Sequence, residues 1–182
     1  MAGSRAVRRS PERPPGGNGT LDSSIEEKIA WAETRYREAG TRLAEDPVAA
    51  GLLDRFRAAA EASRLRMLES GVAAFCRDCD LREGGSCCGK GIEDRYSGVL
   101  LLINRLLDRP LPRKRTDPAG CHFLGPTGCL LSARHVICIN YLCTKITRSI
   151  GPERLRPLRE SEGEEIEALF LLEERVKKVL RC

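Results

Sequence analysis

CRDCDLREGGSCCGKG, residues 76–91, holds four of the nine cysteines in this chain of 182 residues. CHFLGPTGCLLSARHVICINYLC, residues 121–143, holds four more, and Cys182 stands apart at the end of the sequence. Eight cysteines grouped in this way can form disulfides, bind metal, support catalysis or fill an apolar core. The fold of the middle of the chain depends on which of these roles they have.

Whether the cysteines form disulfides or bind metal depends on the cellular compartment of the protein. No apolar run approaches the ~18 residues of a transmembrane helix, and residues 1–20 lack the apolar core of a secretory signal. The sequence therefore predicts a cytoplasmic protein without a membrane segment. Thiols are kept reduced in the cytoplasm, where a cysteine framework more often binds metal or takes part in catalysis than forms disulfides.

Composition argues against a nucleic-acid-binding protein. The net charge is +5, but residues 1–20 hold four arginines and one glutamate, which leaves only +2 for the other 162 residues. Aromatic residues make up 4% of the chain, so platforms for base stacking are scarce. The basic run RPLPRKR, residues 109–115, is interpreted as a solvated loop. Nucleic acid is not expected as a partner, whereas a protein partner stays open.

The chain is predicted to fold mainly as α-helices, with at most a small β-hairpin. Ser24 and Glu27 have the spacing of a capping box, and Asp46-Pro47 is suited to start a second helix that continues to about Phe75. A last helix is expected from about Glu162 to Leu180. These helices would surround an irregular, cysteine-rich metal-binding centre. The predicted regions are a disordered tail rich in Arg, Pro and Gly (1–22), a helical hairpin (23–75), a cysteine-cluster domain (76–150) and a C-terminal helix (151–182).

Local signals subdivide the cysteine-cluster domain. Four glycines within residues 84–91 argue against regular structure in the first cysteine group. A helix is expected from about Asp94 to Asp108. GPTG, residues 125–128, predicts the turn of the small hairpin. Ser132 is suited to cap a further helix that runs toward Ile150.

The cysteine spacing predicts metal ligands that interleave. A C-x2-C step brings two sulfurs to one metal easily, whereas the side chains of adjacent Cys87 and Cys88 diverge in a strand or a helix. Cys138 and Cys143 lie about 140° apart around a helix, so one ion could hold both only if that helix were broken. Two sequence-local sites are therefore disfavoured against a shared site. The predicted ligands are Cys76, Cys79, Cys87, Cys88, Cys121, Cys129, Cys138 and Cys143.

The occupant and any catalytic residue stay open at this point. Thiolates suit both zinc and an iron–sulfur cluster, so the ligand type does not separate the two. His122 and His135 lie within the second group and could take part, although each is interpreted first as a partly buried polar residue. Cys182 is interpreted as an inert terminal thiol. No nucleotide-binding motif is present, and no catalytic residue is identified.

The order CxxC…CC, then C-x-F-L, then G-C, then an arginine four residues before C-x4-C resembles the YkgJ-type cysteine-cluster family, whose domain is described as chelating zinc or iron. The resemblance covers about residues 76–143. Two departures are the longer loop DLREGGS before Cys87 and Arg134-His135 in place of Arg-Pro. The residues that carry the resemblance are Cys76, Cys79, Cys87, Cys88, Cys121, Phe123, Leu124, Gly128, Cys129, Arg134, Cys138 and Cys143.

Three functions are compatible with this sequence. The first is a metal-binding protein that chelates zinc or iron through the eight cysteines. The resemblance also implies an alternative, an iron–sulfur enzyme related to protein-lysine N-methylases, although no methyl-donor motif is present. The third is a structural zinc module for protein interaction.

Overall fold

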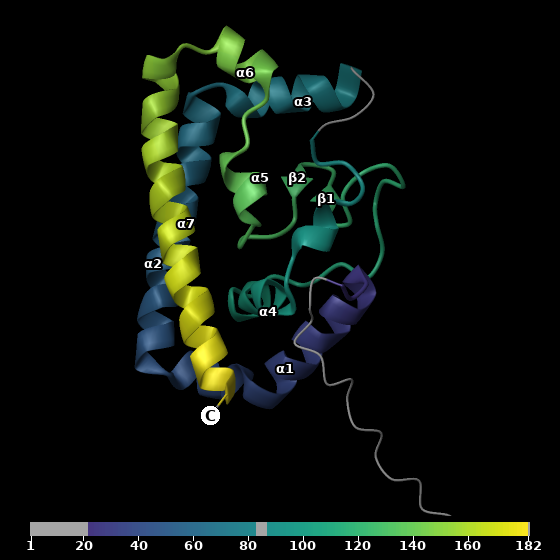
Figure 1. Ribbon diagram of the computed structural model, residues 1–182, viewed down its shortest axis with the longest axis vertical. Coiled ribbons are helices and arrows are strands. Elements are labelled where there is room, and N and C mark those ends of the chain that lie inside the picture. The colour runs from purple at the N-terminus through teal and green to yellow at the C-terminus, as the bar shows by residue number, and fades with distance from the viewer. Residues whose placement is uncertain (1–21, 83–86, 182) are drawn as a thin grey trace, which may run out of the picture.

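The computed structural model describes residues 22–82 and 87–181, a mainly α-helical chain whose described part holds one two-stranded antiparallel sheet (Figure 1). The predicted fold class is confirmed. The predicted disordered tail lies, except for its last residue, outside the described residues. None of the described helices is both long and apolar enough to span a bilayer. The elements are α1 Ile25–Glu45, α2 Pro47–Glu69, α3 Val72–Arg82, a 3-10 turn Ile92–Arg95, α4 Gly98–Leu106, β1 Leu124–Gly125, β2 Gly128–Cys129, α5 Val136–Asn140, α6 Thr144–Ser149 and α7 Pro152–Arg181.

The two longest helices form the spine of the molecule. In Figure 1, α2 and α7 lie side by side in opposite directions over most of its height. Phe56 and Ala60 of α2 are buried, as are Leu172 and Val176 of α7. Helix α1 packs mainly on α4 rather than on α2. The two helices of the 23–75 segment therefore each find their main partner elsewhere in the chain.

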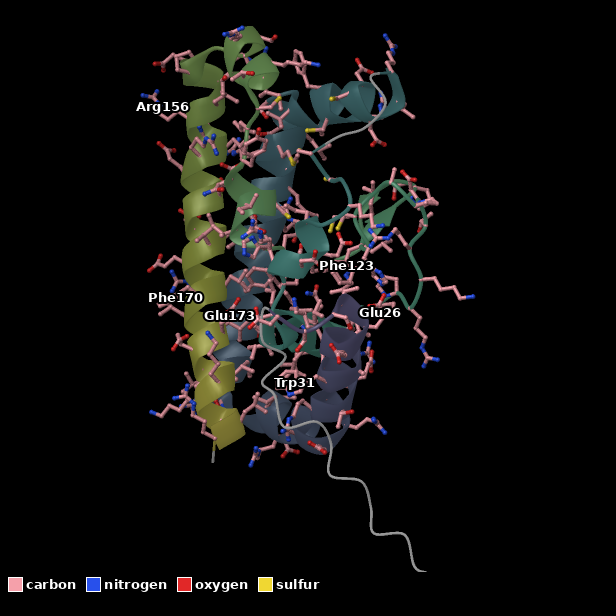
Figure 2. All side chains as sticks on the ribbon, turned by 45° about the vertical axis from the view of Figure 1, so that its right-hand side comes forward. Glu26, Trp31, Phe123, Arg156, Phe170 and Glu173 are labelled. Atoms are coloured by element: carbon pink, nitrogen blue, oxygen red, sulfur yellow. The ribbon has the colours of Figure 1, made fainter. Side chains whose placement is uncertain are left out.

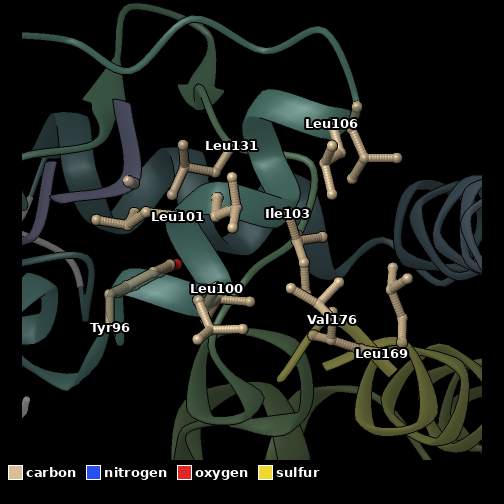
Figure 3. Packing of buried hydrophobic residues seen from close by; sticks show 14 of the residues in the cluster. Tyr96, Leu100, Leu101, Ile103, Leu106, Leu131, Leu169 and Val176 are labelled. Carbon is tan, nitrogen blue, oxygen red and sulfur yellow. The ribbon is translucent and has the colours of Figure 1, made fainter. Parts of the chain in front are cut away.

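Helix α4 is the centre of the core. It is buried along nearly its whole length, and Figure 3 shows Ile103 pointing toward Leu169 and Val176 of α7. Its one buried polar side chain, Asn104, donates to the carbonyls of Leu100 (3.0 Å) and Ala133 (2.9 Å). The Asn104 amide oxygen accepts from the backbone N–H groups of Ser132 (2.8 Å) and Ala133 (3.0 Å). This side chain uses its full hydrogen-bonding capacity and fixes the segment that leads into α5.

The prediction for the first cysteine group is wrong in part. Helix α2 ends at Glu69 rather than near Phe75, because Gly71 adopts a positive φ of 88° that terminates it. Helix α3 then begins at once and carries Cys76 and Cys79. The reason is that residues 72–82 contain neither glycine nor proline, so the helix-breaking glycines act only after Arg82.

The predicted helix from Ser132 to Ile150 is wrong as well. His135, not Ser132, caps the short helix α5, and the chain is extended at Tyr141 and Cys143 before α6 begins. The β-branched residues of α5 have lower helix propensity, which is consistent with its shortness. The break falls between Cys138 and Cys143, which is the condition under which one metal ion could bind both cysteines.

Other helix boundaries differ from those predicted. The predicted helix from Asp94 splits into the 3-10 turn and α4, which Ser97 caps. The small hairpin is confirmed, with Leu124 paired to Cys129 and Gly125 paired to Gly128. Helix α7 begins at Pro152 rather than near Glu162 and continues through Pro157, because Leu155 and Leu158 are buried against Ile146 and Ile150. Burial of those side chains outweighs the helix-breaking tendency of one proline.

Asp46 joins the start of α2 to α7, and the stability that its carboxylate contributes should depend on pH. Its carboxylate accepts from the Ala49 N–H (2.8 Å) and binds Arg175 (Nε–Oδ1 2.9 Å). The Arg175 hydrogen bond, with the Ala49 N–H, lowers the pKa of Asp46 from 3.8 to about 2. A lowered folded-state pKa gives stability that is present above 3.8 and is lost as the pH falls through about 2.

We therefore expect Asp46→Asn to keep the cap but lose the charge, and Asp46→Ala to lose both. Near neutral pH the melting temperature should fall from wild type to Asp46→Asn to Asp46→Ala, by roughly 2–4 °C at each step. The gap between wild type and Asp46→Asn should narrow in thermal melts at about pH 3. A gap that is equally wide at both pH values would contradict the role of the charge.

Gly98 sets how closely α4 approaches α1. A Cβ at this position would lie 2.5 Å from Cε3 of Trp31, whereas a Cβ at Gly51 in α2 meets nothing within 4 Å. Gly98→Ala should therefore lower the free energy of unfolding by about 1–3 kcal/mol, and the control Gly51→Ala should raise it by about 0.5–1 kcal/mol. Urea unfolding followed by Trp31 fluorescence measures both, and equal stabilities would disprove the close contact.

Candidate metal centre

The first cysteine group spans a helix and a bend. Cys76 and Cys79 lie three residues apart on α3, which places them on one face. Cys87 and Cys88 lie in a bend that is neither strand nor helix, and their side chains hydrogen-bond to each other. The divergence expected of adjacent side chains in a strand or a helix does not apply here, because the backbone is neither.

The two cysteine groups are joined by backbone contacts. The Cys121 N–H donates to the Cys88 carbonyl (2.7 Å), the Lys90 N–H donates to the Ala119 carbonyl (2.9 Å), and Gly89 pairs with Gly120 as an isolated antiparallel bridge. This short ladder holds residues 88–90 against residues 119–121. The two groups, about thirty residues apart in sequence, thus meet in space.

The four predicted ligands of the second group lie in four different places. Cys121 is buried (6% exposed) before β1, Cys129 ends β2, Cys138 lies on α5, and Cys143 precedes α6. The hydroxyl of Tyr96, itself 1% exposed, donates to the Cys138 sulfur (3.8 Å). Figure 2 shows most of the sulfur atoms, drawn in yellow, between α3 and the β1–β2 hairpin. Most of the predicted ligands therefore lie in one region of the molecule.

Burial and mutual repulsion disfavour the thiolate form. Burial raises the pKa of Cys76 to about 11, and the charges of Cys87, Cys143 and Cys79 add to the shift. Burial likewise raises the pKa of Cys121 to about 12, against the Phe123 N–H, which lowers it. These thiols are protonated at neutral pH unless a cation stabilises the thiolates.

Arg134 is the main buried cation beside the second group. Desolvation around the sulfur raises the pKa of Cys129, although this residue as a whole is exposed, and of half-buried Cys138, and the charge of Arg134 opposes both shifts. Its Nη2 donates to both carboxylate oxygens of Glu165 on α7 (3.2 and 3.3 Å), and its Nη1 donates to the Cys138 carbonyl (3.4 Å). Its Nε is buried and has no hydrogen-bond partner among the described residues. A buried donor left over beside two thiols is suited to a negatively charged thiolate centre.

The two histidines have different hydrogen-bond partners. Nε2 of His122 is 2.9 Å from the Pro112 carbonyl, which can only accept, so this nitrogen carries a hydrogen. Nδ1 of His135 accepts from the Ile137 N–H (3.2 Å) and thereby caps α5. Burial lowers the pKa of His135, which favours the neutral ring, whose Nε2 then carries the hydrogen. His135 thus acts as a cap.

The cysteines are gathered but do not form a finished coordination sphere. Within residues 22–82 and 87–181, no three Cys, His, Asp or Glu side chains stand at a spacing that holds a metal ion. The backbone brings the segments together, and the thiol side chains would have to turn toward one another to share a metal. Cys182 lies outside the described residues.

Comparison of the chain with protein-family models, with curated proteins and with solved structures found no match. The resemblance to the YkgJ-type family therefore stays a prediction.

Two contributors to this region, Tyr96 and Glu165, were not identified from the sequence as parts of a site. Arg134 was named among the residues that carry the family resemblance, but its ion pair with Glu165 was not predicted. One signal was present, because Glu162 and Glu165 occupy the apolar stripe of α7 that includes Leu158 and Leu169. An acid in such a stripe indicates a buried partner.

The ion pair offers a direct test of this arrangement. Glu165→Gln leaves the buried guanidinium of Arg134 without its counter-charge, so we expect a loss of about 3–5 kcal/mol in the free energy of unfolding. The matched control is Glu167→Gln, since Glu167 pairs with Arg55 on the surface, and it should cost less than about 1 kcal/mol. Urea denaturation measures both values. Similar losses in the two variants would contradict a buried, structural ion pair.

Proposed function

We propose that this chain is a metal-binding protein that holds zinc or iron, the latter including an iron–sulfur cluster, through its cysteines. The observation that carries the proposal is the convergence of thiols from separate elements: α3, the bend at residues 87–88, the β-hairpin, α5 and the segment before α6. The ligands are Cys76, Cys79, Cys87, Cys88, Cys121, Cys129, Cys138 and Cys143.

The chemistry of the donor set supports this function. Thiolates are soft ligands that favour zinc and iron–sulfur clusters over magnesium or calcium. A cation would replace the thiol protons that burial retains on Cys76 and Cys121. Arg134 and the Tyr96 hydroxyl lie beside Cys138 and would stabilise the negative charge of bound thiolates.

A structural role is the form of metal binding that the fold favours. Helices α5 and α6 have five and six residues, and helices this short are not stable by themselves. A metal held by Cys138 or Cys143 would fix either helix to α3 or to the hairpin. Val136 and Ile137 of α5 and the following Tyr141 leave apolar side chains exposed (39–55%), which favours a structural zinc module for protein interaction as the second candidate.

The enzyme alternative rests on the family resemblance alone. Two hollows, of about 440 and 260 Å³, lie beside Arg42 and Arg175 and beside Pro110 and Leu130, and no cysteine lines either of them. An iron–sulfur enzyme related to protein-lysine N-methylases is therefore ranked below the metal-binding and structural functions. The cytoplasmic location stays a prediction.

The proposal predicts metal in protein purified without oxygen and without reconstitution. Metal analysis and an absorption spectrum should show either iron with sulfide and charge-transfer bands, or tightly held zinc without colour. A strong chelator should lower the melting temperature by about 5 °C or more, because the metal binds only the folded chain.

Single substitutions extend this test to the ligands. Cys76→Ser and Cys138→Ser should lower the metal content, whereas Cys182→Ser, which lies outside both cysteine groups, should leave it unchanged. A wild-type chain that holds neither zinc nor iron, with all its thiols reactive, would overturn the proposal.

A further inference from the structure

The cysteines divide between two apolar surroundings. Cys76 and Cys143 both pack against a small apolar cluster where α3, α6 and the start of α7 meet, formed by Val72, Ile146, Ile150, Leu155 and Leu158. Cys121 belongs to the main core, and Cys138 packs against that core. Cys138 and Cys143 are only five residues apart, so the break between α5 and α6 sends them to different clusters.

Two further cysteines follow from their elements. Cys79 shares the face of α3 that carries Cys76. Cys129 of β2 pairs in register with Leu124 of β1, whose N–H donates to the Cys121 carbonyl (3.0 Å). We therefore group Cys79 with Cys76, and Cys129 with Cys121.

The adjacent pair lies at the junction of the two sets. The Cys88 carbonyl accepts from the Cys121 N–H, which holds Cys88 with the main-core set. Cys87 comes between α3 and Cys88 along the chain, so we group it with the cysteines of α3. Because Cys87 and Cys88 are adjacent residues, the two sets adjoin at this point.

We infer that the eight cysteines form two adjoining four-thiolate metal centres rather than one shared centre or two sequence-local ones. Cys76, Cys79, Cys87 and Cys143 form the first centre, and Cys88, Cys121, Cys129 and Cys138 form the second. Each centre takes three ligands from one sequence group and one from the other. This inference rests on the proposed metal-binding function and adds the number of centres and the ligands of each.

Four thiolates per centre match the coordination number of zinc and of an iron–sulfur cluster. The interleaving has a mechanical consequence. The first centre would join α3 to the start of α6, and the second would join the hairpin to α5. Each of the two short helices would then be held by its own centre.

Two double variants distinguish the proposed ligand sets from two sites that each take all their ligands from one sequence group. Cys76→Ser with Cys143→Ser removes two ligands of the first centre but one from each sequence group. Cys76→Ser with Cys88→Ser removes two residues of one sequence group but one ligand from each centre. The reduced, full-length chain is titrated with zinc(II), and bound zinc is counted by native mass spectrometry, with Cys182→Ser as the control.

We expect two zinc ions in wild type and in the control, one in Cys76→Ser with Cys143→Ser, and none held tightly in Cys76→Ser with Cys88→Ser. The reverse order of the two double variants would establish sequence-local sites. Loss of all zinc in both would establish one shared centre. Either result would overturn the inference and leave the proposed function intact, whereas a wild-type chain that binds neither zinc nor iron would overturn the proposed function itself.

A second measurement uses the wild-type chain and therefore does not depend on whether the variants fold. Zinc is withdrawn stepwise with a chelator, and the cysteines that become reactive are alkylated and mapped by peptide mass spectrometry. The inference predicts that protection is lost in two blocks of four, with Cys143 in the block of Cys76 and Cys88 in the block of Cys121. Simultaneous loss at all eight cysteines would contradict it.

Discussion

The hydrogen bonds of Asn104 are the constraint on which the placement of the second cysteine group depends. Helix α4 is surrounded by the core, and an amide in that position is costly to bury unless each of its polar groups is paired. Residues 132 and 133 supply three of the four hydrogen bonds. Cys129, at the end of β2, and the cap of α5 therefore lie on either side of a segment that these hydrogen bonds hold in place. Arg134 follows directly and reaches Glu165 of α7 from there.

The chain places two thiols, of exposed Cys129 and half-buried Cys138, beside a buried cation, Arg134. Desolvation around the sulfurs raises the pKa of both thiols, while Arg134 opposes both shifts and the Tyr96 hydroxyl opposes the shift of Cys138. The two effects act against each other, and a metal cation would shift the balance to the thiolates. The carboxylate of Glu165 neutralises Arg134 from the far side, so the guanidinium can remain in a buried position. The spine helix α7 thereby takes part in the electrostatics of the cysteine region.

Local signals in the sequence were sufficient for part of this fold. The caps at Ser24 and Asp46 were predictable because a cap depends on residues within one turn. The end of α2 at Gly71 and the cap at His135 were not, since nothing in the local sequence shows that the glycine takes a positive φ or that the imidazole turns toward the Ile137 N–H. The early start of α7 depends on burial against α6, which is a tertiary effect. The cysteine spacing predicted a site shared by the two groups, which stays a prediction, whereas the placement of the cysteines against two apolar clusters needed the structure.

The measurement that bears most directly on the central claim is X-ray absorption at the metal edge of the natively purified protein. It reports the atoms bonded to the metal without any substitution in the chain. We expect a first coordination sphere made of sulfur, with about four sulfurs per metal and, for zinc, a zinc–sulfur distance of about 2.3 Å. A first coordination sphere of nitrogen and oxygen at about 2.0 Å would show that the cysteines are not the ligands and would contradict the account.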